Sequence, residues 1–182
     1  MKILYIAYGV SGSGKSTLCR KIATNHAVQG NSAAILSTDA IITSPLYSSQ
    51  LVSQEDDYKK YIVIDDEIYT WSPDGTRPSH LVNQIKCRCC MERNIPVIII
   101  DNTNLTFREI EPYIELAIKN GYEIEFIKSD TRWVINEEEL YQRNLHRVPK
   151  ETIKRQLDKF LRIDLEDWRL KIEDIKQRMK DI

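Results

Sequence analysis

The stretch that most restricts what this chain can fold into is "YGVSGSGKSTLC", which runs from Tyr8 to Cys19. It contains Gly9, four further residues and then the triplet Gly14-Lys15-Ser16, which is the spacing of a phosphate-binding loop, or P-loop. An apolar segment precedes it and a helix-forming segment follows it, as such a loop requires. A glycine-rich turn with an accidental Lys-Ser pair would not need that context. The stretch therefore predicts a site for a nucleoside triphosphate.

Each part of this loop has a chemical task. Glycines at positions 9, 12 and 14 let backbone amides close around phosphate oxygens, and the following helix adds its N-terminal dipole. Lys15 reaches the β- and γ-phosphates, while the hydroxyl of Ser16 or Thr17 can bind Mg²⁺. The expected cofactors are thus ATP and Mg²⁺. The expected nucleotide-binding residues are Gly12, Ser13, Gly14, Lys15, Ser16 and Thr17.

The rest of the chain alternates between strand and helix patterns. Strands are expected at residues 2–8, 33–37, 97–100 and 122–128, and helices at 15–28, 106–120, 137–146 and from 151 onward. This order predicts an α/β fold: a P-loop NTPase-type parallel sheet with helices on both faces, a helical lid and a long C-terminal helix. Thr106 and Glu109 form a capping-box pattern, and Gly121 is a helix stop. The less regular residues 44–79 are expected to form an excursion above the sheet.

Two apolar segments end in acidic residues, "YIVIDDE" and "VIIIDNTN". The second is the purer strand, so Asp101 is expected to be the acid on the Mg²⁺ side, together with Ser16. Asp65 and Asp66 in the first segment are expected to be surface acids. Asp39 ends another strand, where it could accept a proton from a hydroxyl nucleophile. It could equally cap the next helix, and the residues alone leave both roles open.

Two arginines lie four residues apart in "EEELYQRNLHR". This spacing predicts that Arg143 and Arg147 share one helix face, where they would suit a lid that stabilises charge on a transferred phosphate. Solvated arginines beside the acidic Glu137–Glu139 are the alternative. From Arg143 to Arg162 the chain has seven basic and two acidic residues, and such a basic face favours a polyanionic substrate. His146, between the two arginines, gives only a weak signal for a general acid.

Composition restricts the remaining classes. The net charge of −1 gives the whole molecule no basic character. No run approaches the ~20 apolar residues of a membrane span. Three of the four cysteines crowd into "KCRCCM", without a second half-site for a metal, so we expect reduced thiols and a cytoplasmic protein, with a nuclear location left open.

The C-terminal residues carry a heptad-like seam. Its members are Leu161, Leu165, Trp168, Ile172, Ile175 and Met179. We therefore expect a P-loop kinase domain over residues 1–160, including the lid, and an amphipathic C-terminal helix over residues 161–182. The seam either packs back on the domain or contacts a second copy of the chain or another partner.

Several of these motifs together resemble one family. The set "GVSGSGKST", "STDA", "VIIIDNTNL", "SDTRW" and "RNLHRVPKE" is similar to polynucleotide 5′-hydroxyl kinase domains, both of bacteriophage and of animal ubiquitin-ligase-binding proteins. The resemblance implies that Lys15 and Ser16 bind ATP and Mg²⁺, and that Asp39 activates the 5′-hydroxyl. It also implies that Arg147 contacts the donor phosphates, with Arg143 beside it. The implied activity is ATP-dependent phosphorylation of 5′-hydroxyl ends of RNA or DNA.

Two positions depart from the bacteriophage pattern. An arginine expected three residues after the catalytic aspartate is Ile42 here, and the motif Ser-Asp-Thr-Asn reads Asp101-Asn102-Thr103-Asn104. The phosphate next to the acceptor hydroxyl would then be bound by Arg77, Arg108 or the basic stretch Lys150–Arg155. Two alternatives stay open: a P-loop kinase of a small hydroxyl compound, and a nucleotide-regulated interaction module.

Overall fold

The structure is a computed structural model that describes residues 1–39 and 73–180, without the side chains of residues 73–78. In this part of the chain the strands are β1 (Ile3–Ala7), β2 (Ala33–Leu36), β3 (Val97–Asp101) and β4 (Glu123–Ile127). The helices are α1 (Lys15–Val28), α4 (Pro73–Glu92), α5 (Phe107–Asn120), α6 (Glu137–Arg143), α7 (Lys150–Phe160) and α8 (Leu165–Lys180). The expectations for Ile42, Asp65, Asp66, the side chain of Arg77 and most of the excursion at 44–79 lie outside what is described.

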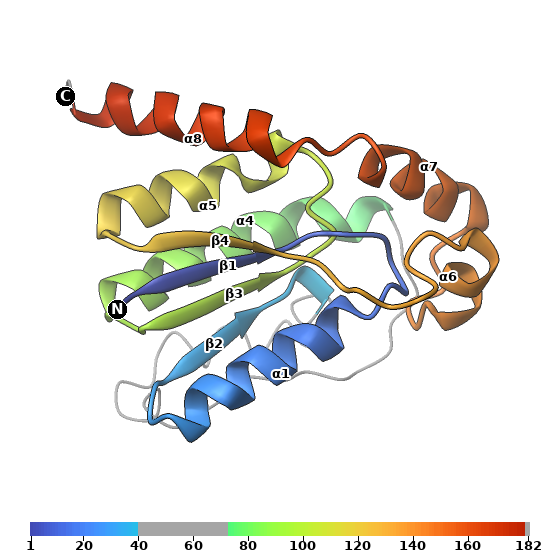
Figure 1. The fold of residues 1–182 in the computed structure, drawn as a ribbon, viewed down its shortest axis with the longest axis horizontal. Helices are drawn as coiled ribbons and strands as arrows, with labels where there is room; N and C mark the ends of the chain where they lie inside the picture. The colour runs from blue at the N-terminus through green and yellow to red at the C-terminus, as the bar shows by residue number, and fades with distance from the viewer. Residues whose placement is uncertain (40–72, 181–182) are drawn as a thin grey trace.

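All four strands are parallel, in the order β2-β3-β1-β4. The connection from β1 through α1 leads to one edge of the sheet, whereas the connection from β3 through α5 leads to the other. The connections that leave β1 and β3 therefore lead toward opposite edges of the sheet. At such a switch point the carboxyl ends of the two neighbouring parallel strands form the crevice where open α/β sheets bind ligands. Figure 1 shows α6 and α7 at this end of the sheet.

The strands bury alternate side chains on the two faces of the sheet, as parallel strands between helix layers require. Leu4 and Ile6 of β1 face the core that α4, α5 and α8 complete. Ile3 and Tyr5 face the opposite side, where α1 contributes Cys19 and other small side chains. The predicted α/β fold with helices on both faces is thus confirmed (Figure 1).

Helix α5 begins and ends where its sequence signals predict. The carboxylate of Glu109 accepts hydrogen bonds from the backbone N–H of Leu105 at 2.7 Å and of Thr106 at 3.2 Å, which completes the capping box at Thr106. At the other end Gly121 has a φ of 70°, in the left-handed region that glycine adopts at little cost.

Helix α6 is shorter than the sequence predicted, since it ends at Arg143 rather than at residue 146. Its end is set by Asn144, whose Oδ1 accepts from the Val148 N–H at 2.8 Å and whose Nδ2 donates to the Val148 carbonyl at 3.2 Å. An asparagine side chain that bonds nearby backbone groups competes with the helical hydrogen bonds. The predicted single helix face bearing Arg143 and Arg147 is therefore wrong, because Arg147 lies in the loop after α6 with a φ of 53°.

The C-terminal residues form a helix that packs back on the sheet and α5. Trp168, Ile172 and Ile175 are buried in the same core as Leu4 and Ile6. The seam does not begin at Leu161, which precedes α8 and is 63% exposed. None of the described helices has the length and apolar character needed to cross a bilayer.

We predict that Ile172→Ala lowers the free energy of unfolding by about 2–5 kcal/mol, because it leaves a cavity between α8 and the core. Leu170→Ala is the matched control: Leu170 lies on the same helix but is 68% exposed, so its loss should change stability by no more than about 0.5 kcal/mol. Urea unfolding of both variants, with the mass in solution measured in parallel, tests the packing. Equal midpoints for the two variants would contradict it.

Candidate active site

The P-loop joins β1 to α1 at the carboxyl end of the sheet. Gly9, Gly12 and Gly14 have φ values of 143°, 81° and 92°, which place all three in the region that other residues enter only with strain. At Gly12 a side chain is also excluded by space, since a Cβ atom there would overlap the Leu140 carbonyl and lie 3.2 Å from the Asn144 N–H. The loop can therefore follow this path only with glycine at position 12.

The side chain of Lys15 is buried against the P-loop. Its ammonium donates to the Val10 carbonyl at 2.9 Å, and only 8% of the residue is exposed. Burial lowers the pKa of Lys15, while the nearby carboxylates of Asp101 and Asp39 oppose that shift. A buried cation held among carboxylates at the open end of a P-loop fits the β- and γ-phosphates of a nucleotide.

Asp101 is the last residue of β3 and points to the same face of the sheet as Ile99, toward α1. Its carboxylate accepts hydrogen bonds from the Ser16 hydroxyl and the Cys19 thiol. Burial raises the pKa of Asp101, and Lys15 and Ser16 oppose this. A desolvated carboxylate beside a hydroxyl fits Mg²⁺, which prefers a few protein oxygens and takes the others from phosphates and water.

The residues after Asp101 in this motif join the ends of three strands by hydrogen bonds. Asn102 Oδ1 accepts from both the N–H and the hydroxyl of Thr38, each at 2.9 Å. The backbone carbonyl of Thr103 accepts a hydrogen bond from the Gly9 N–H at 2.8 Å, and the side-chain Nδ2 of Asn104 donates one to the Ala7 carbonyl at 2.6 Å. Successive strand residues alternate in direction, so Asp101 faces the P-loop helix whereas Asn102 reaches the end of β2.

Asp39 follows β2 and contacts a residue that the sequence had hardly indicated. Its Oδ2 lies 3.2 Å from Nε2 of His146, in the loop between α6 and α7. The side chain of Asp39 is 41% exposed and that of His146 is 27% exposed. Asp39 also lies close enough to Lys15 and Asp101 to influence both electrostatically. A lone histidine has no spacing pattern, so nothing in the sequence could have paired it with Asp39.

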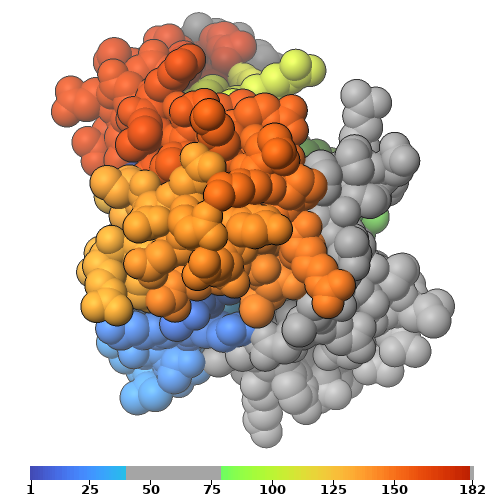
Figure 2. Space-filling view, turned by 90° about the vertical axis from the view of Figure 1, so that its right-hand side faces the viewer, coloured from blue at the N-terminus to red at the C-terminus, as the bar shows by residue number. Residues whose placement is uncertain are grey.

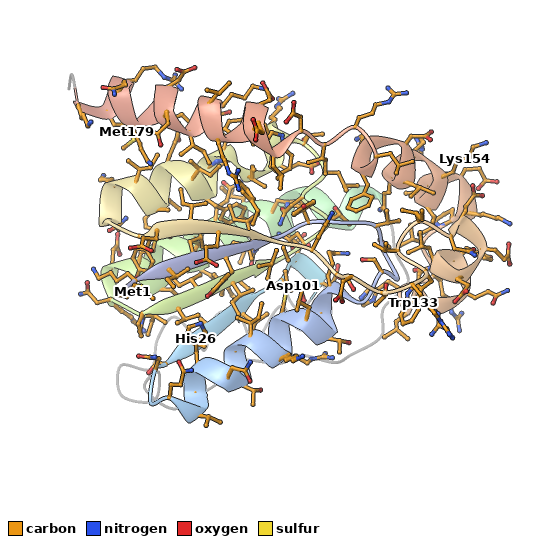
Figure 3. All side chains as sticks on the ribbon, in the orientation of Figure 1. Met1, His26, Asp101, Trp133, Lys154 and Met179 are labelled. Carbon is orange, nitrogen blue, oxygen red and sulfur yellow. The ribbon has the colours of Figure 1, made fainter. Side chains whose placement is uncertain are left out.

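The P-loop is also held from outside by residues that sequence reasoning missed. Thr131 donates to the Ser13 carbonyl at 3.0 Å, and the Trp133 indole donates to the Gly12 carbonyl at 3.1 Å. Gln156 of α7 accepts from the Ser11 N–H at 2.9 Å. The motif "SDTRW" supplies the first two of these contacts, so a polar-aromatic segment directly after a strand was the available signal. Figure 3 shows Trp133 at this end of the molecule.

The two predicted lid arginines have different surroundings. Arg143 is bound to Glu139 at 3.2 Å and lies over the Trp133 ring at 4.0 Å from its centre. Arg147 is exposed, in the loop that carries His146. The structure brings Lys15, Ser16, Asp39 and Asp101 together, whereas Arg143 ends α6 and Arg147 lies in the loop that follows.

Basic side chains cover the outside of α7. Lys154, Arg155 and Lys159 are exposed there, whereas Lys150 is paired with Glu138 at 2.5 Å. Figure 2 shows the side of the molecule that α6 and α7 occupy, and Figure 3 shows Lys154 projecting from it. This surface adjoins the end of the sheet that carries the P-loop.

Comparison with known proteins agrees with this geometry. Residues 4–163 match a family model described as an AAA domain. Human NEDD4-binding protein 2 is 33% identical over 160 residues, which are 88% of this chain but 8% of that protein. A 2′,3′-cyclic-nucleotide 3′-phosphodiesterase from Pongo abelii is 23% identical over 85% of this chain and 30% of its own length. The chain thus spans less than a third of these two relatives.

Solved structures show the same fold. One chain of the Pnkp1/Rnl/Hen1 RNA repair complex superposes with a TM-score of 0.55 and 20% identity, over 88% of this chain and 44% of that one. The likeness supports the α/β architecture derived above from the strand order. With its P-loop at the switch point of a parallel sheet and its family match over most of its length, this chain belongs to the AAA domain family as a P-loop kinase-like domain.

Proposed function

We propose that this domain transfers the γ-phosphate of ATP to the 5′-hydroxyl end of RNA or DNA. The observation that carries the proposal is the convergence of Lys15, Asp101 and Asp39 at one crevice. Two of these residues suit a nucleotide with its metal, and the third suits a hydroxyl acceptor. The exposed basic side chains of α7 support a polyanionic acceptor, and the likeness to a chain of an RNA repair complex agrees with it.

In this proposal the donor side depends on three residues. Lys15 binds the β- and γ-phosphate oxygens, while Ser16 and Asp101 hold Mg²⁺. When bound, Mg²⁺ neutralises charge on the phosphates. Because burial disfavours the charged forms of Lys15 and Asp101, both gain from the opposite charges that a nucleotide and its metal bring. In the proposal Arg147, an exposed residue of the loop that also carries His146, stabilises negative charge on the transferred group.

On the acceptor side Asp39 takes the proton. A bond forms between the acceptor oxygen and the γ-phosphorus as the bond from that phosphorus to the bridging oxygen breaks. ADP leaves, and the hydroxyl proton goes to the Asp39 carboxylate, which returns it to water. General-base help of this kind is worth about 10²–10⁴-fold in rate.

We also propose that the domain works in a reducing compartment, with the cytoplasm as the simplest choice. All four cysteines are free thiols, and Cys19, Cys87 and Cys90 are buried. Burial raises the pKa of Cys90 to about 12, which keeps this thiol protonated and unreactive.

Asp39→Asn should lower turnover by about 10²-fold or more and leave ATP affinity within a few-fold, because Asp39 acts on the acceptor proton. Lys15→Ala should weaken both ATP binding and turnover, since Lys15 contacts the donor throughout. Asp174→Asn, on the exposed side of α8, is the control and should change neither. Steady-state kinetics with a 5′-hydroxyl oligonucleotide and ATP-binding titrations measure the difference. Near-normal turnover of Asp39→Asn would refute the base assignment.

The two arginines should behave differently. Arg147→Ala should slow transfer by about 10³-fold if its guanidinium stabilises transition-state charge, and Arg147→Lys should recover only part of the rate. Arg143→Ala should leave transfer within a few-fold, because Arg143 is already bound to Glu139 and Trp133. Single-turnover rates of the three variants provide the test. Equal losses at both positions would mean that Arg143 leaves these partners during the reaction.

The acceptor class is tested by salt and by chain length. A polynucleotide that contacts α7 should bind less tightly as salt rises, with a slope of about −0.7 in log–log form per phosphate neutralised on a single strand. Apparent affinity should also rise from one to several nucleotides and then level off. Replacing Lys154, Arg155 and Lys159 by Ser should flatten the salt dependence and spare ATP binding.

The matched control removes three exposed basic residues of α8, Arg169, Arg178 and Lys180. It changes the net charge by the same amount at a different place, so it should leave the salt slope nearly unchanged. If a free nucleoside or a sugar is phosphorylated as efficiently as an oligonucleotide, the acceptor is a small hydroxyl compound and the polynucleotide proposal is wrong.

A further inference from the structure

The contact between His146 and Asp39 joins residues from distant parts of the chain. Asp39 follows β2, and His146 lies between α6 and α7, yet Nε2 and Oδ2 are 3.2 Å apart. Both side chains are partly exposed, and a polar contact at such exposure contributes little to folding stability. Folding stability therefore does not account for the contact between His146 and Asp39, whereas its position beside the crevice suggests a role in the site.

The loop that carries His146 is fixed from both ends. Asn144 bonds both backbone groups of Val148, and Val148 is buried in a small core with Val10 and Leu140. Arg147 has a φ of 53°, a conformation that non-glycine residues keep only when their surroundings enforce it. One conformation of the loop is thus enforced, and it places the imidazole against the carboxylate.

We infer that His146 is a positioning residue for Asp39. In this arrangement the Nε2–H of the imidazole donates to Oδ2 and fixes the plane of the carboxylate. The oriented carboxylate then accepts the proton of the acceptor hydroxyl. It can do so while it accepts from the imidazole, because the two oxygens of a carboxylate together offer several acceptor sites. The inference rests on the proposed function, in which Asp39 is the base.

The same contact links the two halves of the site. His146 belongs to the loop whose Val148 packs with Val10 of the P-loop, and α6 touches the P-loop at Gly12. The orientation of the acceptor-side carboxylate is therefore set by the segment that also surrounds the donor loop. His146 keeps its own proton during transfer, because the hydroxyl proton goes to Asp39.

A double-mutant cycle tests whether His146 acts through Asp39. His146→Ala should lower kcat by about 10- to 100-fold, as expected for a misoriented catalytic group, with little change in the KM for ATP. His146→Gln retains an N–H donor and should recover most of the loss. In the Asp39→Asn background His146→Ala should have no further effect.

Gln142→Ala provides the matched control, because Gln142 lies on α6 and bonds Glu138 away from Asp39. It should leave kcat unchanged in both backgrounds. Additive losses for His146→Ala and Asp39→Asn would overturn the inference. So would a failure of His146→Gln to exceed His146→Ala, since a donor at that position is the proposed cause.

A second readout does not depend on activity. Nitrogen-15 NMR of the nucleotide-free protein should show a proton on Nε2 of His146, with the signals assigned by their loss in His146→Gln. Asp39→Ala should shift this signal strongly, whereas Asp174→Asn should not. An unchanged signal in Asp39→Ala would overturn the contact even if transfer is observed. If the unaltered protein phosphorylates no acceptor, the proposed function fails, and the NMR comparison still decides whether His146 holds Asp39.

Discussion

The site is organised around opposite charges removed from water at the end of the sheet. The register of β1 and β3 pairs Ala7 with Asp101, so the acid stands at the level where the P-loop begins. Burial disfavours the charged forms of Lys15 and Asp101, and each partly compensates the other. Charged groups in such surroundings interact more strongly with a ligand than they would in water. The topology therefore prepares the electrostatics on which nucleotide binding depends.

Around this pair, hydrogen bonds from several segments hold the P-loop in one conformation. The P-loop is held by the strand-end motif at Gly9, by the segment after β4 at Gly12 and Ser13, and by Gln156 at Ser11. Loops usually hold functional groups less rigidly than regular elements do. Here hydrogen bonds from three directions compensate for that, so little ordering of the loop remains to oppose ligand binding.

The sequence was informative wherever a local pattern had a local cause. The P-loop spacing, the capping box at Thr106 and the strand periodicity each depend on neighbours in the chain, and they predicted the sheet, α1 and α5 well. The end of α6 was mispredicted because the helical pattern gave no weight to the side chain of Asn144. The contact of His146 with Asp39 could not be predicted, since it depends on how loops far apart in sequence meet. The outward placement of Arg147 has the same origin.

The tight contact at Gly12 has an evolutionary consequence. Because the backbone of the loop lies directly against the Leu140 carbonyl of α6, no side chain fits at position 12 unless the helix shifts. A shift of α6 would in turn displace Leu140 and Val148 from the core that they share with Val10. Descendants of this domain can therefore change the exposed outer face of α7 more freely than the loop–helix junction, whose residues must change together.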